Sequence, residues 1–147
     1  EERLSAAKAD GIRVAAIGAL VSSAPAGGHF VLPQLLTDIP DGHEVLREEL
    51  FGPVLVVQVF VDEAEALAIA NATDFGLCAG VWTRDGGRQL RLAKAIRSGQ
   101  VFINNYGAAG GVELPFGGVG RSGHGREKGF EGLRSYTRIK TVAIKHG

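Results

Sequence analysis

Between residues 54 and 104, the apolar positions follow strand-like and helix-like patterns in turn. The segment from Val54 to Val61 is almost entirely apolar and rich in β-branched residues, which is typical of a strand buried on both faces. Asp62 and Glu65 form a capping box, which predicts a helix to about Thr73. The pattern then predicts a strand at 79–83, a helix at 85–97 and a strand at 101–104. This order of strands and helices predicts an α/β fold with a parallel βαβ sheet.

The second of these helices carries signals at both ends. Asp85 is a favourable N-cap, and Leu92, Ala93 and Ile96 form the apolar stripe expected to be buried. Gly99 follows at the place where a glycine commonly ends a helix. We therefore expect this helix to connect two parallel strands.

The two ends of the chain have weaker patterns. Residues 5–21 predict the end of a helix and a short strand, and residues 22–28 predict a loop. Residues 29–36 are apolar but contain Pro33, which predicts an edge or irregular strand. The tail, residues 136–145, alternates around Ile139, Val142 and Ile144 and predicts a strand. Because no strand follows it, its partner must lie far away in the chain or on another subunit.

Composition narrows the class of protein. The chain has 147 residues, 45% of them hydrophobic, with 16 basic and 16 acidic residues and no formal net charge. This composition indicates one globular domain and gives no electrostatic reason to expect nucleic acid or a membrane as a partner. Cys78 is the single cysteine, so an internal disulfide and a thiolate metal cluster are excluded, and no zinc-ligand spacing occurs. An apolar setting favours Cys78 as a small core residue, and an unpaired thiol is typical of a reducing, cytoplasmic compartment.

Glycine and methionine usage are both unusual. Many of the 22 glycines cluster between Gly107 and Gly132, which indicates one local site and not a linker. The chain contains no Met and begins with Glu1, so we expect a fragment of a longer protein. Gly118–Gly123 fits the GxGxxG pattern, but it lacks the preceding strand and the later acidic residue that dinucleotide binding requires. We therefore interpret it as a tight irregular loop.

Glu49 and Phe51 stand just before the most apolar predicted strand, followed by Gly52-Pro53. If the backbone is extended there, the two side chains point the same way. A carboxylate can accept hydrogen bonds from both hydroxyls of a diol, and an aromatic ring can pack against a flat heterocycle. For this spacing alone, a surface acid beside a core Phe is the favoured interpretation.

Two stretches together resemble the C-terminal part of the aldehyde dehydrogenase superfamily. The first is Glu48-Glu49-Leu50-Phe51-Gly52-Pro53-Val54. The second runs from Gly99 to Tyr106, through Pro115-Phe116-Gly117-Gly118 and on to Val142. The resemblance implies an enzyme that oxidises an aldehyde to a carboxylic acid with NAD or NADP. It also implies a division into a catalytic-domain part, residues 1–135, and an oligomerisation tail, residues 136–147, which makes a dimer or a tetramer.

The resemblance also assigns roles to individual residues. It implies that Glu49 binds the nicotinamide ribose and that Phe51 and Leu77 lie beside the nicotinamide. It places Asn105, Tyr106 and Phe116 at the mouth of the substrate tunnel. The family's nucleophilic cysteine and general-base glutamate lie upstream of the residues matched here, so no catalytic residue is expected in this chain and the 147 residues alone should be inactive.

The sequence departs from the family pattern at two places. Gly120 stands where many relatives have Lys, and residues 107–111 lack the bulky aromatics that some relatives carry, so the aldehyde cannot be inferred. Two other interpretations stay open, namely a naturally truncated interaction module without catalysis and an acyl-phosphate reductase on the same fold.

Overall fold

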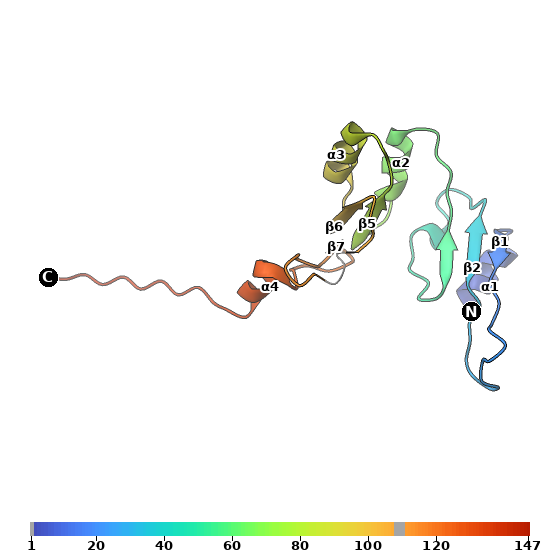
Figure 1. Ribbon diagram of the computed structural model, residues 1–147, viewed down its shortest axis with the longest axis horizontal. Helices are drawn as coiled ribbons and strands as arrows, with labels where there is room; N and C mark the ends of the chain where they lie inside the picture. The colour runs from blue at the N-terminus through green and yellow to red at the C-terminus, as the bar shows by residue number, and fades with distance from the viewer. Residues whose placement is uncertain (1, 108–110) are drawn as a thin grey trace. The chain divides into compact units, whose positions relative to one another are not determined.

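The computed structural model describes residues 2–107 and 111–147 and has an α/β fold. Contacts within the chain divide it into two compact units, the first ending at Ala66 and the second beginning at Leu67. The expected division after residue 135 falls inside the second unit. Figure 1 follows the chain through both units.

The first unit contains a small mixed sheet with one helix. Its sheet has the strand order β1-β2-β3, in which β1 is antiparallel and β3 parallel to β2. The unit's elements are α1 (Glu2–Ala9), β1 (Arg13–Ile17), β2 (Gln34–Thr37), the 3-10 helix η1 (Glu44–Leu46) and β3 (Val54–Val56). The helix end and short strand expected in residues 5–21 are therefore confirmed.

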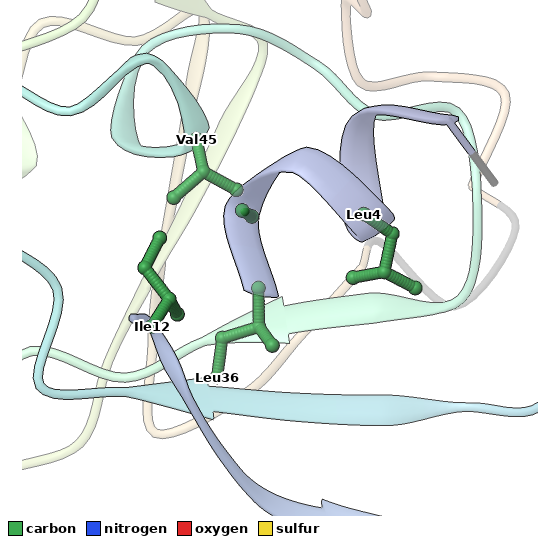
Figure 2. Close-up of a cluster of buried hydrophobic side chains, with 5 residues drawn as sticks. Leu4, Ile12, Leu36 and Val45 are labelled. Atoms are coloured by element: carbon green, nitrogen blue, oxygen red, sulfur yellow. The ribbon is translucent and has the colours of Figure 1, made fainter. Parts of the chain in front are cut away.

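The core of the first unit is small and lies where α1 meets the sheet. Leu4 from α1, Ile12, Leu36 from β2 and Val45 from η1 are its labelled members in Figure 2, and Ala7 completes the cluster. Leu36 is fully buried. Apolar side chains on one face of α1 therefore fix the helix against β2.

The second unit is built around a βαβ connection. The strands β5 (Cys78–Val81) and β6 (Gln100–Ile103) pair in parallel, and α3 (Gly86–Ala95) connects them. A second pair, β4 (Phe75–Gly76) and β7 (Val119–Gly120), is antiparallel. The remaining helices are α2 (Glu63–Ala70), which spans the boundary between the units, and α4 (Gly129–Ser135). The parallel connection expected here is confirmed for β5–α3–β6. The strand expected to join this sheet through the preceding helix is β3, and it pairs instead with β2 in the first unit's sheet.

Side-chain caps explain where two of the helices begin. The Asp62 carboxylate accepts a hydrogen bond from the Glu65 N–H at 2.8 Å, as the capping box predicts. The Glu65 carboxylate accepts its bond from the Val61 N–H at 2.7 Å, one residue before the Asp62 N–H of a standard box. At α3, Asp85 accepts a hydrogen bond from the Arg88 N–H at 2.8 Å. This bond lowers the pKa of the Asp85 carboxyl, because it favours the ionised form.

Two predictions about strands are wrong. The strand expected over Val54–Val61 forms only at Val54–Val56, and it is an edge strand whose Leu55 is 64% exposed. The apolar pattern reports a preference for burial, but only one face of this segment packs against the core, through Val54 and Val56, and Leu55 on the other face is exposed.

The edge or irregular strand expected over residues 29–36 forms at Gln34–Thr37 as the central β2, so the edge position is wrong, and its pairing with β1 is irregular between Val14 and Ala16. Pro33 lies just before β2 and removes no ladder hydrogen bond.

The tail does not form its predicted strand within this chain. No helix or strand is assigned after Ser135 (Figure 1), and Ile139 is 99% exposed. A strand needs a hydrogen-bonded partner, and the tail has none in the described part of the chain. The helix α4, which directly precedes the tail, was not expected from the sequence.

Residues 2–107 and 111–147 contain neither a membrane-spanning helix nor a metal-binding cluster. None of the described helices is long and apolar enough to cross a membrane. The described His, Cys, Asp and Glu side chains form no cluster that could hold a metal ion.

Candidate functional site

A cavity of about 250 Å³ opens beside β5 and β6 in the second unit. Most of its wall is apolar or aromatic, and it includes two of the residues expected at the substrate tunnel, Tyr106 and Phe116. The other lining residues are Cys78, Gln100, Phe102, Gly107, Gly111, Leu114 and Lys128. The family resemblance also places residues 107–111 at the tunnel mouth. Residues 108–110 of this segment lie outside the described residues.

Hydrogen bonds from two different segments hold the loop that carries Phe116. Phe116 and Glu127 exchange two backbone hydrogen bonds, both of 2.7 Å. The Gln100 side-chain amide donates to the Pro115 carbonyl oxygen at 3.0 Å, which ties the loop to the start of β6. The same loop passes Gly99 so closely that a Cβ there would lie 1.6 Å from the Gly117 carbonyl oxygen. These contacts fix the position of the Phe116 ring in the cavity wall.

Gly99 therefore has a different role from the one expected. It does not adopt the left-handed conformation of a helix-ending glycine, and α3 ends at Ala95 with Ile96 as its C-cap. Its requirement for glycine comes from the close approach of the Gly117 backbone.

Aromatic rings and one ammonium group shape the interior of the cavity. The Phe102 and Tyr106 rings lie 6.0 Å apart between centroids, tilted by 58°. The Lys128 Nζ lies 5.6 Å from the centroid of the Phe116 ring, within the range of a cation–π contact. Gln100, Phe102 and Lys128 were not expected at the site from the sequence. Gln100 and Phe102 could have been found, because alternate residues of a strand share a face.

Two asparagines shape the turn after β6. Asn104 has a φ of 52° and its side-chain amide makes two hydrogen bonds to the Thr83 backbone, of 2.8 and 3.0 Å. Asn105 accepts a hydrogen bond from the Tyr106 N–H at 2.8 Å and donates to the Gly107 carbonyl at 3.2 Å. Asn105 is not among the described lining residues, and its two hydrogen bonds hold the turn that carries Tyr106. Direct substrate contact by Asn105 stays a prediction.

The residues expected to contact the coenzyme are distributed over both units. Glu49 and Phe51 lie on the first unit's loop between η1 and β3, and both are exposed, Phe51 at 89%. Phe51 has a φ of 48°, so the extended backbone assumed for this pair is not present. Leu50 between them packs against the core, which anchors the loop. Leu77, in the second unit, lies exposed between β4 and β5.

The GxGxxG segment is the irregular loop that the sequence analysis expected. It contains the short strand β7, and its Arg121 N–H donates to the Asp74 carbonyl at 2.8 Å. The Ser122 hydroxyl accepts a hydrogen bond from the Gly76 N–H at 3.0 Å. These bonds hold β7 beside β4. Gly118 and Gly120 allow a close approach to neighbouring backbone, whereas Gly123 has open space around it and a φ of 98°.

Comparison with known proteins identifies the family. The model of the aldehyde dehydrogenase family matches residues 1–142. Betaine aldehyde dehydrogenase 1 from Rhizobium meliloti (strain 1021) is 43% identical over 140 residues, which are 95% of this chain and 28% of that protein. The chain thus spans less than a third of the length of this relative.

Solved structures give the same result. A crystal structure from Burkholderia cenocepacia, assigned as an aldehyde dehydrogenase, is 62% identical with a TM-score of 0.92, and the match covers 99% of this chain and 31% of that one. Mycobacterium tuberculosis aldehyde dehydrogenase, complexed with NAD+, is 33% identical with a TM-score of 0.85, over 99% of this chain and 30% of that one. The chain belongs to the aldehyde dehydrogenase family.

Proposed function

We propose that this chain is the C-terminal part of an NAD(P)-dependent aldehyde dehydrogenase, which we call the complete enzyme. The observation that carries this proposal is the family match over residues 1–142. The complete enzyme converts an aldehyde, water and the oxidised coenzyme to a carboxylic acid, the reduced coenzyme and a proton. Because the nucleophile and the general base belong to other parts of the enzyme, the 147 residues alone should not oxidise aldehydes.

The exposed residues of the first unit fit a role in coenzyme binding. The Glu49 carboxylate is exposed and can accept hydrogen bonds from two ribose hydroxyls. The Phe51 ring is 89% exposed, which leaves its face open for a flat heterocycle. In the second unit, Leu77 is exposed as well and offers an apolar side chain. The bound coenzyme supplies the hydride acceptor, and these residues orient it.

We expect Glu49→Gln in the complete enzyme to slow hydride transfer more than it weakens coenzyme binding. An amide keeps one acceptor but loses the charge, and the loss of a charged hydrogen bond costs about 1–3 kcal/mol. Single-turnover kinetics and a coenzyme-binding titration measure the two effects separately. Glu44→Gln is the matched control, because Glu44 is an exposed acid in η1 outside the predicted site. An unchanged hydride step in Glu49→Gln would remove Glu49 from the site.

The cavity of the second unit fits the aldehyde side of the reaction. Its aromatic wall can hold the apolar part of an aldehyde, with Tyr106 and Phe116 as the contacting residues and Asn105 behind Tyr106. The bonds between Phe116 and Glu127 keep the ring in place, so the shape of the wall is preformed.

Phe116→Ala is expected to change the preference of the complete enzyme among aldehydes of different bulk. Enlarging an apolar pocket changes kcat/KM by about 1–3 kcal/mol between substrates that differ by a few carbons. A series of straight and branched aldehydes measures the change, with thermal unfolding recorded on the same samples. If Phe116 were only a core residue, all aldehydes would lose activity together and the melting temperature would fall.

The tail fits a role in subunit assembly. Residues 136–145 are rich in β-branched residues, which favour strands, and Ile139 is 99% exposed in the single chain. Such a segment is an aggregation hazard unless it is paired, and pairing in a symmetric oligomer satisfies its backbone. We therefore infer that the complete enzyme is a homo-oligomer, a dimer or a tetramer.

A further inference from the structure

Lys128 occupies an unusual backbone position at the edge of the cavity. It precedes α4 with φ of 60° and ψ of 175°, a conformation that only glycine adopts without strain. Both neighbours are anchored, Glu127 through its two hydrogen bonds with Phe116, and Gly129 through its N–H to the Val112 carbonyl at 2.7 Å. The chain therefore fixes the start of the Lys128 side chain with respect to the Phe116 loop.

The ammonium of Lys128, an exposed residue at the edge of the cavity, lies over the Phe116 ring. Its Nζ lies 5.6 Å from the ring centroid. Aromatic walls such as that of Phe102, Tyr106 and Phe116 are the surfaces with which proteins bind quaternary ammonium groups. Here the face of one ring already has a cation over it. A second cation would gain less from that ring and would be repelled by the ammonium.

Lys128 also sets the charge of the cavity. Among the described residues that line it, Lys128 is the one with a formal charge. The neutral polar residue Gln100 has its amide N–H bound to the Pro115 carbonyl. The field at the cavity therefore favours an anionic group and disfavours a cationic one.

We propose that Lys128 is a specificity-determining residue, which selects aldehydes with a carboxylate at the distal end and selects against trimethylammonium aldehydes. This inference rests on the proposed function, because it assigns the cavity to the aldehyde. The proposed substrate preference differs from that implied by the name of the Rhizobium meliloti relative, which is betaine aldehyde dehydrogenase 1. Betaine aldehyde is a trimethylammonium compound.

The test compares substrates of equal shape and different charge on the complete enzyme. Betaine aldehyde is paired with its tert-butyl analogue, in which carbon replaces the charged nitrogen. Succinic semialdehyde is paired with the analogue whose isopropyl group replaces the carboxylate. The ratio of kcat/KM within each pair isolates charge, because losses that come from altered folding affect both members equally.

The variants are Lys128→Met, which keeps the length and apolar stem, and Lys128→Arg, which keeps the charge. Lys94→Met is the matched control, because Lys94 is an exposed lysine in the last turn of α3 and does not line the cavity. We expect Lys128→Met to shift the first ratio about tenfold toward betaine aldehyde and the second about tenfold away from succinic semialdehyde. Lys128→Arg and Lys94→Met should leave both ratios within about twofold of the wild type.

The outcomes separate this inference from the function on which it rests. If the wild type oxidises aldehydes but Lys128→Met leaves both ratios unchanged, the inference is overturned and the proposed function stands. The inference is also overturned if Lys94→Met shifts the ratios as much as Lys128→Met. If the wild-type complete enzyme oxidises no aldehyde of either pair, the proposed function fails and the inference fails with it.

Discussion

Gly99→Ala should destabilise the complete enzyme by about 3 kcal/mol or more, the upper end of what overpacking costs. The added methyl group would lie 1.6 Å from the Gly117 carbonyl oxygen and 2.7 Å from its carbon. These are backbone atoms, so no side-chain rotation relieves the overlap. The loop must move away from β6, which breaks the Gln100–Pro115 hydrogen bond and displaces Phe116. Urea unfolding measures the loss of stability, and steady-state kinetics measures the effect on the cavity.

Gly86→Ala is the matched control for this substitution. Gly86 is the first residue of α3, and a Cβ there meets nothing within 4 Å. Alanine lowers the conformational entropy of the unfolded chain relative to glycine. The free energy of unfolding of this variant should therefore be unchanged or higher by up to about 1 kcal/mol. If Gly99→Ala unfolds at the same urea concentration as Gly86→Ala, the Gly117 backbone does not lie as close to Gly99 as described, and the prediction is refuted.

The parts of the fold that were predictable have local causes. The connection β5–α3–β6 could be predicted because Asp85 caps the helix through a residue three positions away, and because the flanking strands are short apolar runs. The capping box of Asp62 and Glu65 is local in the same sense. Each of these signals is complete within a few residues, so no distant contact is needed to interpret it.

The parts that were not predictable depend on contacts between distant residues. Whether Val54–Val61 is covered on one face or two is decided by its neighbours, and the pattern of the segment itself is the same in both cases. Gly99 and Gly117 meet across 18 positions of sequence, so the reason for a glycine at 99 is invisible locally. Lys128 reaches Phe116 only because Phe116 and Glu127 pair backbone to backbone.

The same distinction between local signals and distant contacts applies to the residues of the candidate site. Tyr106 and Phe116 were found through a resemblance between motifs, and the structure brings both to one cavity. Phe102 and Gln100 follow from strand alternation once β6 is known. The direction of Glu49 and Phe51 could not be derived, because Phe51 has a positive φ that residue spacing does not reveal.

Ile139→Asp combined with Val142→Asp should dissociate the complete enzyme into subunits. Ile139 is 99% and Val142 70% exposed in the single chain, so both are available for burial between subunits. Burying two such side chains contributes about 3–6 kcal/mol, which corresponds to a factor of roughly 10²–10⁴ in the dissociation constant. A buried carboxylate adds a desolvation cost to that loss. Sedimentation velocity at micromolar concentration measures the assembly of both proteins.

The control must separate the loss of apolar contact from the change in charge. The double variant adds two negative charges, and Lys140→Asp makes the same change in net charge at one position between the two sites. The Lys140→Asp enzyme should stay assembled, because it keeps both apolar side chains and the strand pattern. If Lys140→Asp dissociates as completely as the double variant, charge repulsion explains the result and the apolar tail does not hold the subunits together. A wild-type enzyme that sediments as a monomer, or a double variant that stays fully assembled, would show that the tail pairs with no second subunit.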